Sequence, residues 1–198
     1  EISVLDPGGY GSVTITKSIS IVADGDLGSI LAAGTNGVVI NAGVNDVVVL
    51  SGLEINGVAK SASPGLVGVK VLQAGRVVIR NTLIQNFNTA GVQVEPSGAT
   101  ARVSIENTSI INSTIGVLSK GGVFAAIATL NRSMLTGNQT AGVRADGAVA
   151  YTISSDTIIT NSTVAFDVLN GGRNKTFGNN TVSNCGSNGT LQPVTPLL

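Results

Sequence analysis

The chain has 198 residues, and its 11 lysines and arginines balance 11 aspartates and glutamates, so its formal net charge is zero. This balance gives no electrostatic reason to expect nucleic acid or an anionic membrane as a partner, and 42% hydrophobic residues exclude a disordered chain. Histidine and tryptophan are absent and Cys185 is the single cysteine, so the commonest general base and any internal disulfide are missing. No run of 18 apolar residues predicts a membrane span, and we expect no metal and no cofactor.

Residues 1–22 are predicted to form an N-terminal coil of short strands around the turn signal Asp6-Pro7-Gly8-Gly9. The stretches 23–46 and 57–66 fit a strand pattern less well, and we expect both to project at least partly as loop excursions. Loops are where a rigid scaffold usually carries its function. The alternating apolar pairs of the N-terminal coil are Ile2/Val4, Val13/Ile15 and Ile19/Ile21.

A repeat governs most of the chain. Residues 76–94 align with 102–119, and residues 129–145 and 152–168 follow the same template. In each unit an apolar residue closes one strand, a second follows five positions later, and a small residue before an apolar one marks a third strand. The repeats begin 23 to 29 residues apart. The three predicted inward sets are Leu50, Ile79, Ile105, Leu130, Ile153 and Phe177; Ile55, Ile84, Ile110, Leu135, Ile158 and Val182; and Gly37-Val38, Gly68-Val69, Gly91-Val92, Gly116-Val117, Gly142-Val143 and Ala165-Phe166.

This pattern predicts an all-β fold in a single domain that spans residues 1–198. Apolar residues at i and i+2, as in Val77/Ile79 and Tyr151/Ile153, lie on one face of a strand. Strands this short cannot bury that face alone, but stacking each unit on the next buries it in an aliphatic interior. No segment has the period of a crossover helix, which leaves a single-stranded, right-handed parallel β-helix of about seven coils. Residues 187–198 are expected to form a C-terminal tail or cap, because Pro193 and Pro196 cannot continue a ladder.

The Gly-Val-x-Val and Ile-x-Asn-Thr-x-Ile units, together with the opening segment 4–19, resemble bacterial right-handed parallel β-helix repeat proteins of the pectin-lyase-like superfamily. The resemblance covers nearly the whole chain and implies secretion to the cell surface or the extracellular space. It implies activity only weakly, since many members have no assigned chemistry. The polygalacturonase-like Gly-His-Gly and the Trp- and His-containing signature of pectate lyases are both missing, so we expect no enzymatic activity.

A strip of outward residues beside the Gly-Val strands is the candidate ligand site, because the resemblance places polysaccharide binding there. Oppositely charged residues alternate along the strip at roughly 4.8 Å, so they are also placed to form ion pairs worth roughly 0.2–1 kcal/mol each. Both interpretations stay open at this point. The candidate ligand-binding residues are Lys70, Gln93, Glu95, Lys120, Arg144, Asp146 and Asp167.

Three functions remain as hypotheses. The first is a non-catalytic extracellular scaffold, self-associating end to end through the uncovered edge of its N-terminal coil. The second is a carbohydrate-binding module that uses the strip. The third, disfavoured by the missing histidine and the sparse acids, is a polysaccharide lyase or hydrolase.

Overall fold

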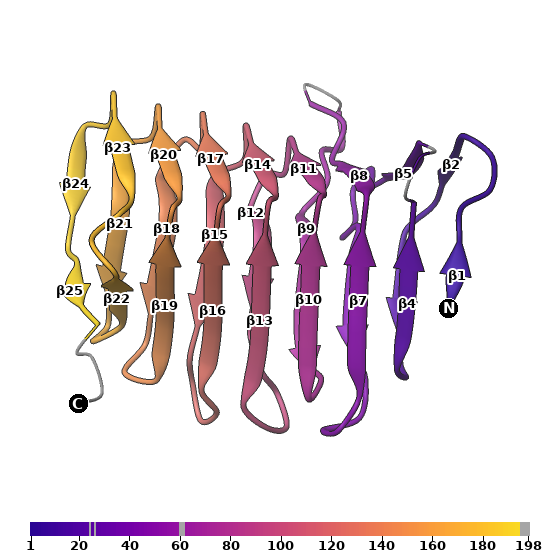
Figure 1. Cartoon of the computed structure of the whole chain (residues 1–198), viewed down its shortest axis with the longest axis horizontal. Coiled ribbons are helices and arrows are strands. Elements are labelled where there is room, and N and C mark those ends of the chain that lie inside the picture. The colour runs from indigo at the N-terminus through magenta and orange to yellow at the C-terminus, as the bar shows by residue number, and fades with distance from the viewer. Residues whose placement is uncertain (24, 26, 60–61, 195–198) are drawn as a thin grey trace.

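The computed structural model describes residues 1–23, 25, 27–59 and 62–194, which form 25 short β-strands (Figure 1). This part of the chain contains no helix, and therefore no helix long and apolar enough to cross a membrane. Every strand pairs in parallel with the strands three places before and after it, so each coil adds one strand to each of three sheets. The predicted parallel β-solenoid of about seven turns is thus confirmed, and its right-handed sense stays a prediction.

The three sheets differ in strand length. Sheet A contains β1 (Ile2–Ser3), β4 (Ile19–Val22), β7 (Val47–Ser51), β10 (Arg76–Arg80), β13 (Ala101–Glu106), β16 (Ala126–Asn131), β19 (Ala150–Ser155), β22 (Arg173–Thr176) and β25 (Gln192–Pro193). Sheet B contains β2 (Gly8–Tyr10), β5 (Gly28–Leu31), β8 (Leu53–Asn56), β11 (Leu83–Gln85), β14 (Ser109–Ile111), β17 (Met134–Thr136), β20 (Ile158–Thr160) and β23 (Thr181–Ser183). Sheet C contains β3 (Val13–Ile15), β6 (Val38–Asn41), β9 (Val67–Gln73), β12 (Ala90–Val94), β15 (Ile115–Lys120), β18 (Ala141–Asp146), β21 (Val164–Leu169) and β24 (Ser187–Gly189).

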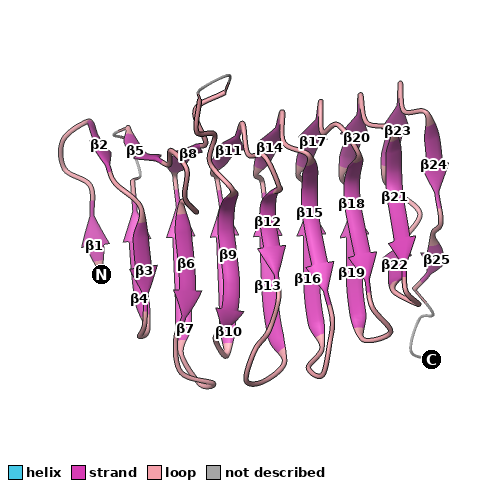
Figure 2. Ribbon diagram, turned by 180° about the vertical axis from the view of Figure 1, so that it is seen from behind, coloured by secondary structure: helices cyan, strands magenta, loops and turns pink. Residues whose placement is uncertain are grey.

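Sheets A and C form the two broad faces of a flattened coil, and the short strands of sheet B close one edge between them. Sheet A faces the viewer in Figure 1, and sheet C does so in Figure 2, the view from behind. The connections that lead from sheet C back to sheet A lie along the opposite edge.

The interior is built from columns of aliphatic side chains that occupy equivalent positions in successive coils. In sheet A, for example, Leu50, Ile79, Ile105 and Leu130 are in register and fully buried. Burying one such side chain stabilises the fold by about 1.5–3 kcal/mol. Because each coil supplies only part of this burial, the coils are stable together rather than singly.

The glycine of the Gly-Val unit is required by close packing between coils. A Cβ atom at Gly91 would lie 2.3 Å from Cγ2 of Ile110, and one at Gly142 would lie 2.3 Å from Cγ2 of Ile159. Both distances are too short for real contacts, so the small residue of the repeat leaves room for the isoleucine of the following coil.

The corner between sheets A and B is the same in four coils. Its first residue adopts a positive φ, as in Asn107 at 46° and Asp156 at 47°. The next residue is a buried Thr or Ser whose hydroxyl donates to the carbonyl oxygen two residues earlier, such as Thr108 to Glu106 at 2.9 Å. This bond satisfies the buried hydroxyl at the bend and fixes the residue that begins the next strand. The four corners are Asn81-Thr82, Asn107-Thr108, Arg132-Ser133 and Asp156-Thr157.

The register set by the corner shows that the predicted inward positions of Ile153 and Ile158 are wrong. Asp156-Thr157 aligns with the earlier corners, and this register directs Ile159 inward and leaves Ile158 44% exposed. In β19 the same register turns Thr152 and Ser154 inward and places Tyr151 and Ile153 on the outer face. The alternation of apolar residues therefore predicted the wrong face for this coil.

Phe177 is also not part of the interior, because its relative exposure is 63%. In the last coils the interior positions of sheet A are polar instead of aliphatic. The Thr152 hydroxyl donates to Oδ1 of Asn174 at 2.5 Å, and Nδ2 of Asn180 donates to the Thr176 hydroxyl at 2.7 Å. The predicted aliphatic column of sheet A therefore ends at Leu130, whereas Ile159, Phe166 and Val182 continue the apolar interior on sheets B and C.

One of the two predicted excursions and the described part of the predicted tail belong to the coil. Residues 23–46 contribute β5 to sheet B and β6 to sheet C, because their Gly28 and Gly37 permit the same close packing as the later glycines. The tail predicted at 187–198 contributes β24 and β25, and its residues 195–198 lie outside the described residues. The described residues of 57–66 form no strand and connect β8 to β9.

The corner makes Ile158 and Ile159 a matched pair for testing the register. Ile159→Ala should lower the free energy of unfolding by about 2–5 kcal/mol, because it empties a buried site, whereas Ile158→Ala should change it by less than about 0.5 kcal/mol. Urea denaturation followed by circular dichroism measures both. The reverse ranking would show that β20 lies one residue out of the register described.

Candidate functional site

The candidate strip lies on the outer face of sheet C, where parallel pairing stacks its members across successive strands. Lys70, Gln93, Leu118, Arg144 and Asp167 form one continuous outward column. The second column is continuous from Lys120 through Asp146 to Leu169. In the earlier coils a register shift after Ile40 pairs Asn41 with Gln73 and not with Leu72.

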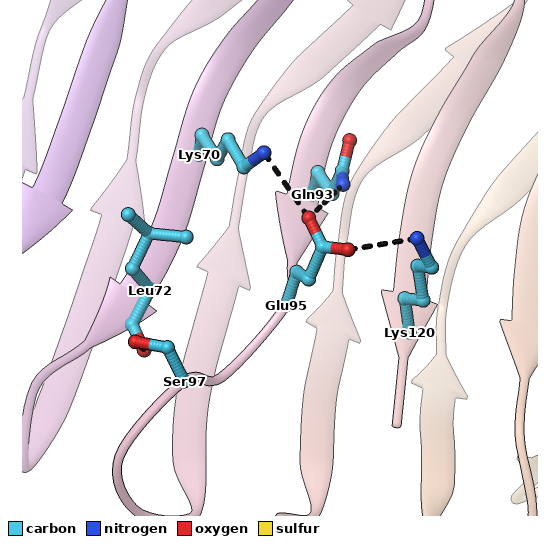
Figure 3. A network of polar contacts seen from close by, with 6 residues as sticks. All are labelled: Lys70, Leu72, Gln93, Glu95, Ser97 and Lys120. Carbon is cyan, nitrogen blue, oxygen red and sulfur yellow. Dashed lines mark hydrogen bonds and ion pairs between the residues drawn. The ribbon is translucent and has the colours of Figure 1, made fainter. Parts of the chain in front are cut away.

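Glu95 is the centre of the strip (Figure 3). Its Oε2 lies 3.1 Å from Nζ of Lys70, and its Oε1 lies 2.7 Å from Nζ of Lys120. The side-chain amide of Gln93 also donates to Oε2 at 2.8 Å. Three neighbouring strands thus direct two cations and an amide at one carboxylate.

The remaining members of the strip are paired as well. Nε of Arg144 donates to Oδ2 of Asp167 at 2.7 Å, and these side chains are only 19% and 20% exposed. Oδ1 of Asp146 accepts a hydrogen bond from the Asn170 amide at 2.6 Å. The structure therefore brings the seven candidate residues onto one face, where three cations and three carboxylates balance one another and each has a polar partner.

The ion pairs change the acidity of the central groups. Partial burial raises the pKa of the Glu95 carboxyl, but the hydrogen bonds and charges of Lys120 and Lys70 outweigh burial and hold this pKa below its usual value. The hydrogen bond and the negative charge of Glu95 in turn raise the pKa of Lys120. A general base works best with a pKa near the working pH, so Glu95 is a weak proton acceptor at neutral pH.

Asp46 is a second carboxylate with a perturbed pKa, and it lies at the turn before β7. Hydrogen bonds from the Ser18 hydroxyl at 2.6 Å and from the Gly43 amide at 2.7 Å lower the pKa of its carboxyl. It caps a turn in the connection between two coils and is half-buried. Across the residues that the structure describes, no group of three or more histidine, cysteine, aspartate or glutamate side chains is placed to hold a metal ion.

An open hollow of about 420 Å³ lies at the corner between sheets B and C, where Ala59 and Pro64 overhang the bend. Asn86 and Asn112 line it, and both adopt positive φ, at 69° and 54°. The amide of Asn86 donates to Oδ1 of Asn56 at 3.0 Å, so this side chain links adjacent coils. The asparagines at the bend thus have a structural role that their backbone angles explain.

The sequence reasoning missed a second charged surface. The outer face of sheet A carries five cations, and none of them was a candidate. They occupy alternate, outward positions of the predicted strands, as in Arg76-Val77-Val78-Ile79-Arg80, and this pattern could have identified them. The five are Arg76, Arg80, Arg102, Arg173 and Lys175.

Comparison with protein-family models, with curated proteins and with solved structures found no match to this chain.

The Glu95 cluster predicts a specific dependence of stability on pH. Glu95→Gln removes two partly exposed ion pairs and should lower the free energy of unfolding at pH 7 by about 1 kcal/mol. Because the native pKa of Glu95 lies below its ordinary value of 4.5, this stabilisation is present above that value and is lost as the pH falls through the native pKa. Urea denaturation should therefore show a difference between wild type and variant at pH 7 that shrinks at acid pH, below the native pKa of Glu95.

Glu54→Gln is the control for this prediction. The Glu54 carboxylate accepts a hydrogen bond from the Gln85 amide at 2.8 Å, and it forms no ion pair within the described part of the chain. Its replacement should change stability at pH 7 by less than about 0.5 kcal/mol. An effect of Glu95→Gln that is equal at both pH values would contradict the ionic origin of the stabilisation.

Proposed function

We propose that this chain is a non-catalytic structural module, a bacterial, extracellular or cell-surface β-helix of the pectin-lyase-like type. The observation that carries the proposal is the mutual pairing of Lys70, Glu95 and Lys120, with Arg144 and Asp167 beside them. Each of these charged side chains is already paired with another one in the coil. The pairs stabilise the coil, which suits a rigid structural role. A stack of coils with a buried aliphatic interior supplies a stiff rod.

The proposal includes self-association of two copies through the N-terminal coil. A hollow of about 230 Å³ opens at that end, and its lining is mostly apolar, with Val13, Ile21, Ile30 and Leu53 at the edge of the core. Strand β1 pairs with β4 on one side and with no described strand on the other, so its free edge is a template for a strand of a second copy. The last two strands at the opposite end, β24 (Ser187–Gly189) and β25 (Gln192–Pro193), carry no large aliphatic or aromatic side chain. Two apolar N-terminal ends therefore match each other better than either matches the opposite end.

Analytical ultracentrifugation tests this association. The wild-type chain should dimerise with rising concentration, and Ile2→Lys should weaken the dimer at least tenfold, because it places a charge in the apolar end. Val123→Lys is the matched control, since Val123 is 89% exposed and lies in the connection between β15 and β16, several coils away. A wild-type chain that stays monomeric, or equal effects of both substitutions, would contradict association through this end.

A carbohydrate-binding role for the strip is the second candidate, and its support is the outward column on sheet C, whose members from Lys70 to Asp167 are polar except Leu118. A ligand there would have to replace the contacts that Glu95 and Asp167 already make. We therefore expect a glycan array to show no binding above background. Binding that is lost in Glu95→Gln but kept in Glu54→Gln would favour the carbohydrate-binding function instead.

A further inference from the structure

The outer face of sheet A has a charge pattern that differs in kind from that of sheet C. It carries the five cations Arg76, Arg80, Arg102, Arg173 and Lys175. The described carboxylates on or beside this face include that of Glu106, which the ladder places beside Arg80, and that of Glu1, which lines the same shallow hollow as Arg76 and Arg80. Within the described residues, all ion pairs lie on sheet C and none involves a cation of sheet A.

Two of these cations are neighbours in the ladder. The register that pairs Val77 with Val103 places Arg76 beside Arg102, and both side chains are exposed. Neighbouring strands lie about 4.8 Å apart, and like charges side by side are destabilising. On sheet C the chain uses the same spacing to set Lys120 beside Asp146, two charges of opposite sign. An anion that lies over both guanidinium groups would turn the repulsion on sheet A into attraction.

The outward row that holds these arginines is not uniformly charged. From Arg102 it continues through Ile127 and Tyr151 to Arg173. The Arg173 guanidinium lies over the Tyr151 ring, 5.7 Å from its centroid, and donates to its hydroxyl at 3.4 Å. Cationic groups thus lie at two places along the rod, with half-buried apolar and aromatic side chains between them. A small anion would reach one group, whereas an extended partner would contact both.

We propose that the outer face of sheet A lies flat on an anionic lipid surface. The face is a single sheet of nine strands, so the rod presents its arginines and Lys175 along one side (Figure 1). Arginines attract anionic headgroups, and tyrosine with aliphatic neighbours suits the boundary between headgroups and acyl chains. A highly charged soluble polymer would match the arginines but leave Ile127 and Tyr151 without apolar contact. Phe177, which directly follows β22 and is 63% exposed, adds an aromatic side chain near Arg173 and Lys175.

The zero net charge of the chain does not oppose this orientation. Three carboxylates, those of Glu95, Asp146 and Asp167, lie on sheet C, the broad face that points away from the proposed lipid surface. Lys70, Lys120 and Arg144 lie with them, so sheet C is balanced by itself. The excess of positive charge on sheet A therefore orients the rod, although the sum over the chain is zero.

Co-sedimentation with vesicles tests the proposal. Wild-type chain should bind vesicles of phosphatidylcholine with phosphatidylglycerol, should not bind vesicles of phosphatidylcholine alone, and should be released by high salt. Arg76→Gln with Arg102→Gln should weaken binding about 25-fold, on the scale of about fivefold for each cation near an anionic surface. Both side chains are exposed, so circular dichroism should show an unchanged fold.

Lys70→Gln with Lys120→Gln is the matched control, because it removes the same amount of charge from the opposite face. This double variant should bind anionic vesicles within about twofold of wild type. Equal loss in both double variants would overturn the proposal, since binding would then follow net charge alone. Equal binding to both kinds of vesicle would also overturn it. So would the absence of vesicle binding under conditions in which heparin or duplex DNA retains the chain, because the partner would then be a soluble polyanion.

Discussion

A coil of this solenoid buries its inner side chains only because the coils on either side supply similar side chains at the equivalent positions. The column from Leu50 through Ile79 and Ile105 to Leu130 illustrates this dependence, since each member contacts the next across about one strand spacing. Close stacking in turn requires a residue without a side chain where Gly91 and Gly142 meet the next isoleucine. The repeat of the sequence is thus a direct consequence of packing between coils.

The corners decide which residues enter this stack. A positive φ followed by a hydroxyl that bonds back to the chain sets the first residue of each sheet B strand, as at Asn107-Thr108. Where the hydrophobic pattern and the corner disagree, as at Asp156-Thr157, the corner prevails, and two hydroxyl residues enter the interior of β19. The free-energy cost of burying these hydroxyl groups is offset by hydrogen bonds with polar side chains of the next coil, such as Asn174 and Asn180.

The same ladder spacing gives the two broad faces different properties. On sheet C it brings Lys120 and Glu95 to 2.7 Å, which stabilises the rod and leaves the charges occupied. On sheet A it sets Arg76 beside Arg102 and leaves both without a described acidic partner. A rigid rod with one balanced face and one cationic face has a preferred orientation toward any anionic surface. The structural role and the proposed lipid contact are therefore properties of different faces and do not compete.

The sequence by itself determined the parallel solenoid, most of its aliphatic columns and the outward column from Lys70 to Asp167, because these follow from local alternation and from a repeat of nearly constant length. It could not determine the face of Ile153 or Ile158, since alternation fits both faces and only the corner hydrogen bond selects one. Nor could it show that positive charge gathers on sheet A, because net charge is a sum over the chain. Only the tertiary register brings residues about 25 positions apart, such as Arg76 and Arg102, to the same place on one face.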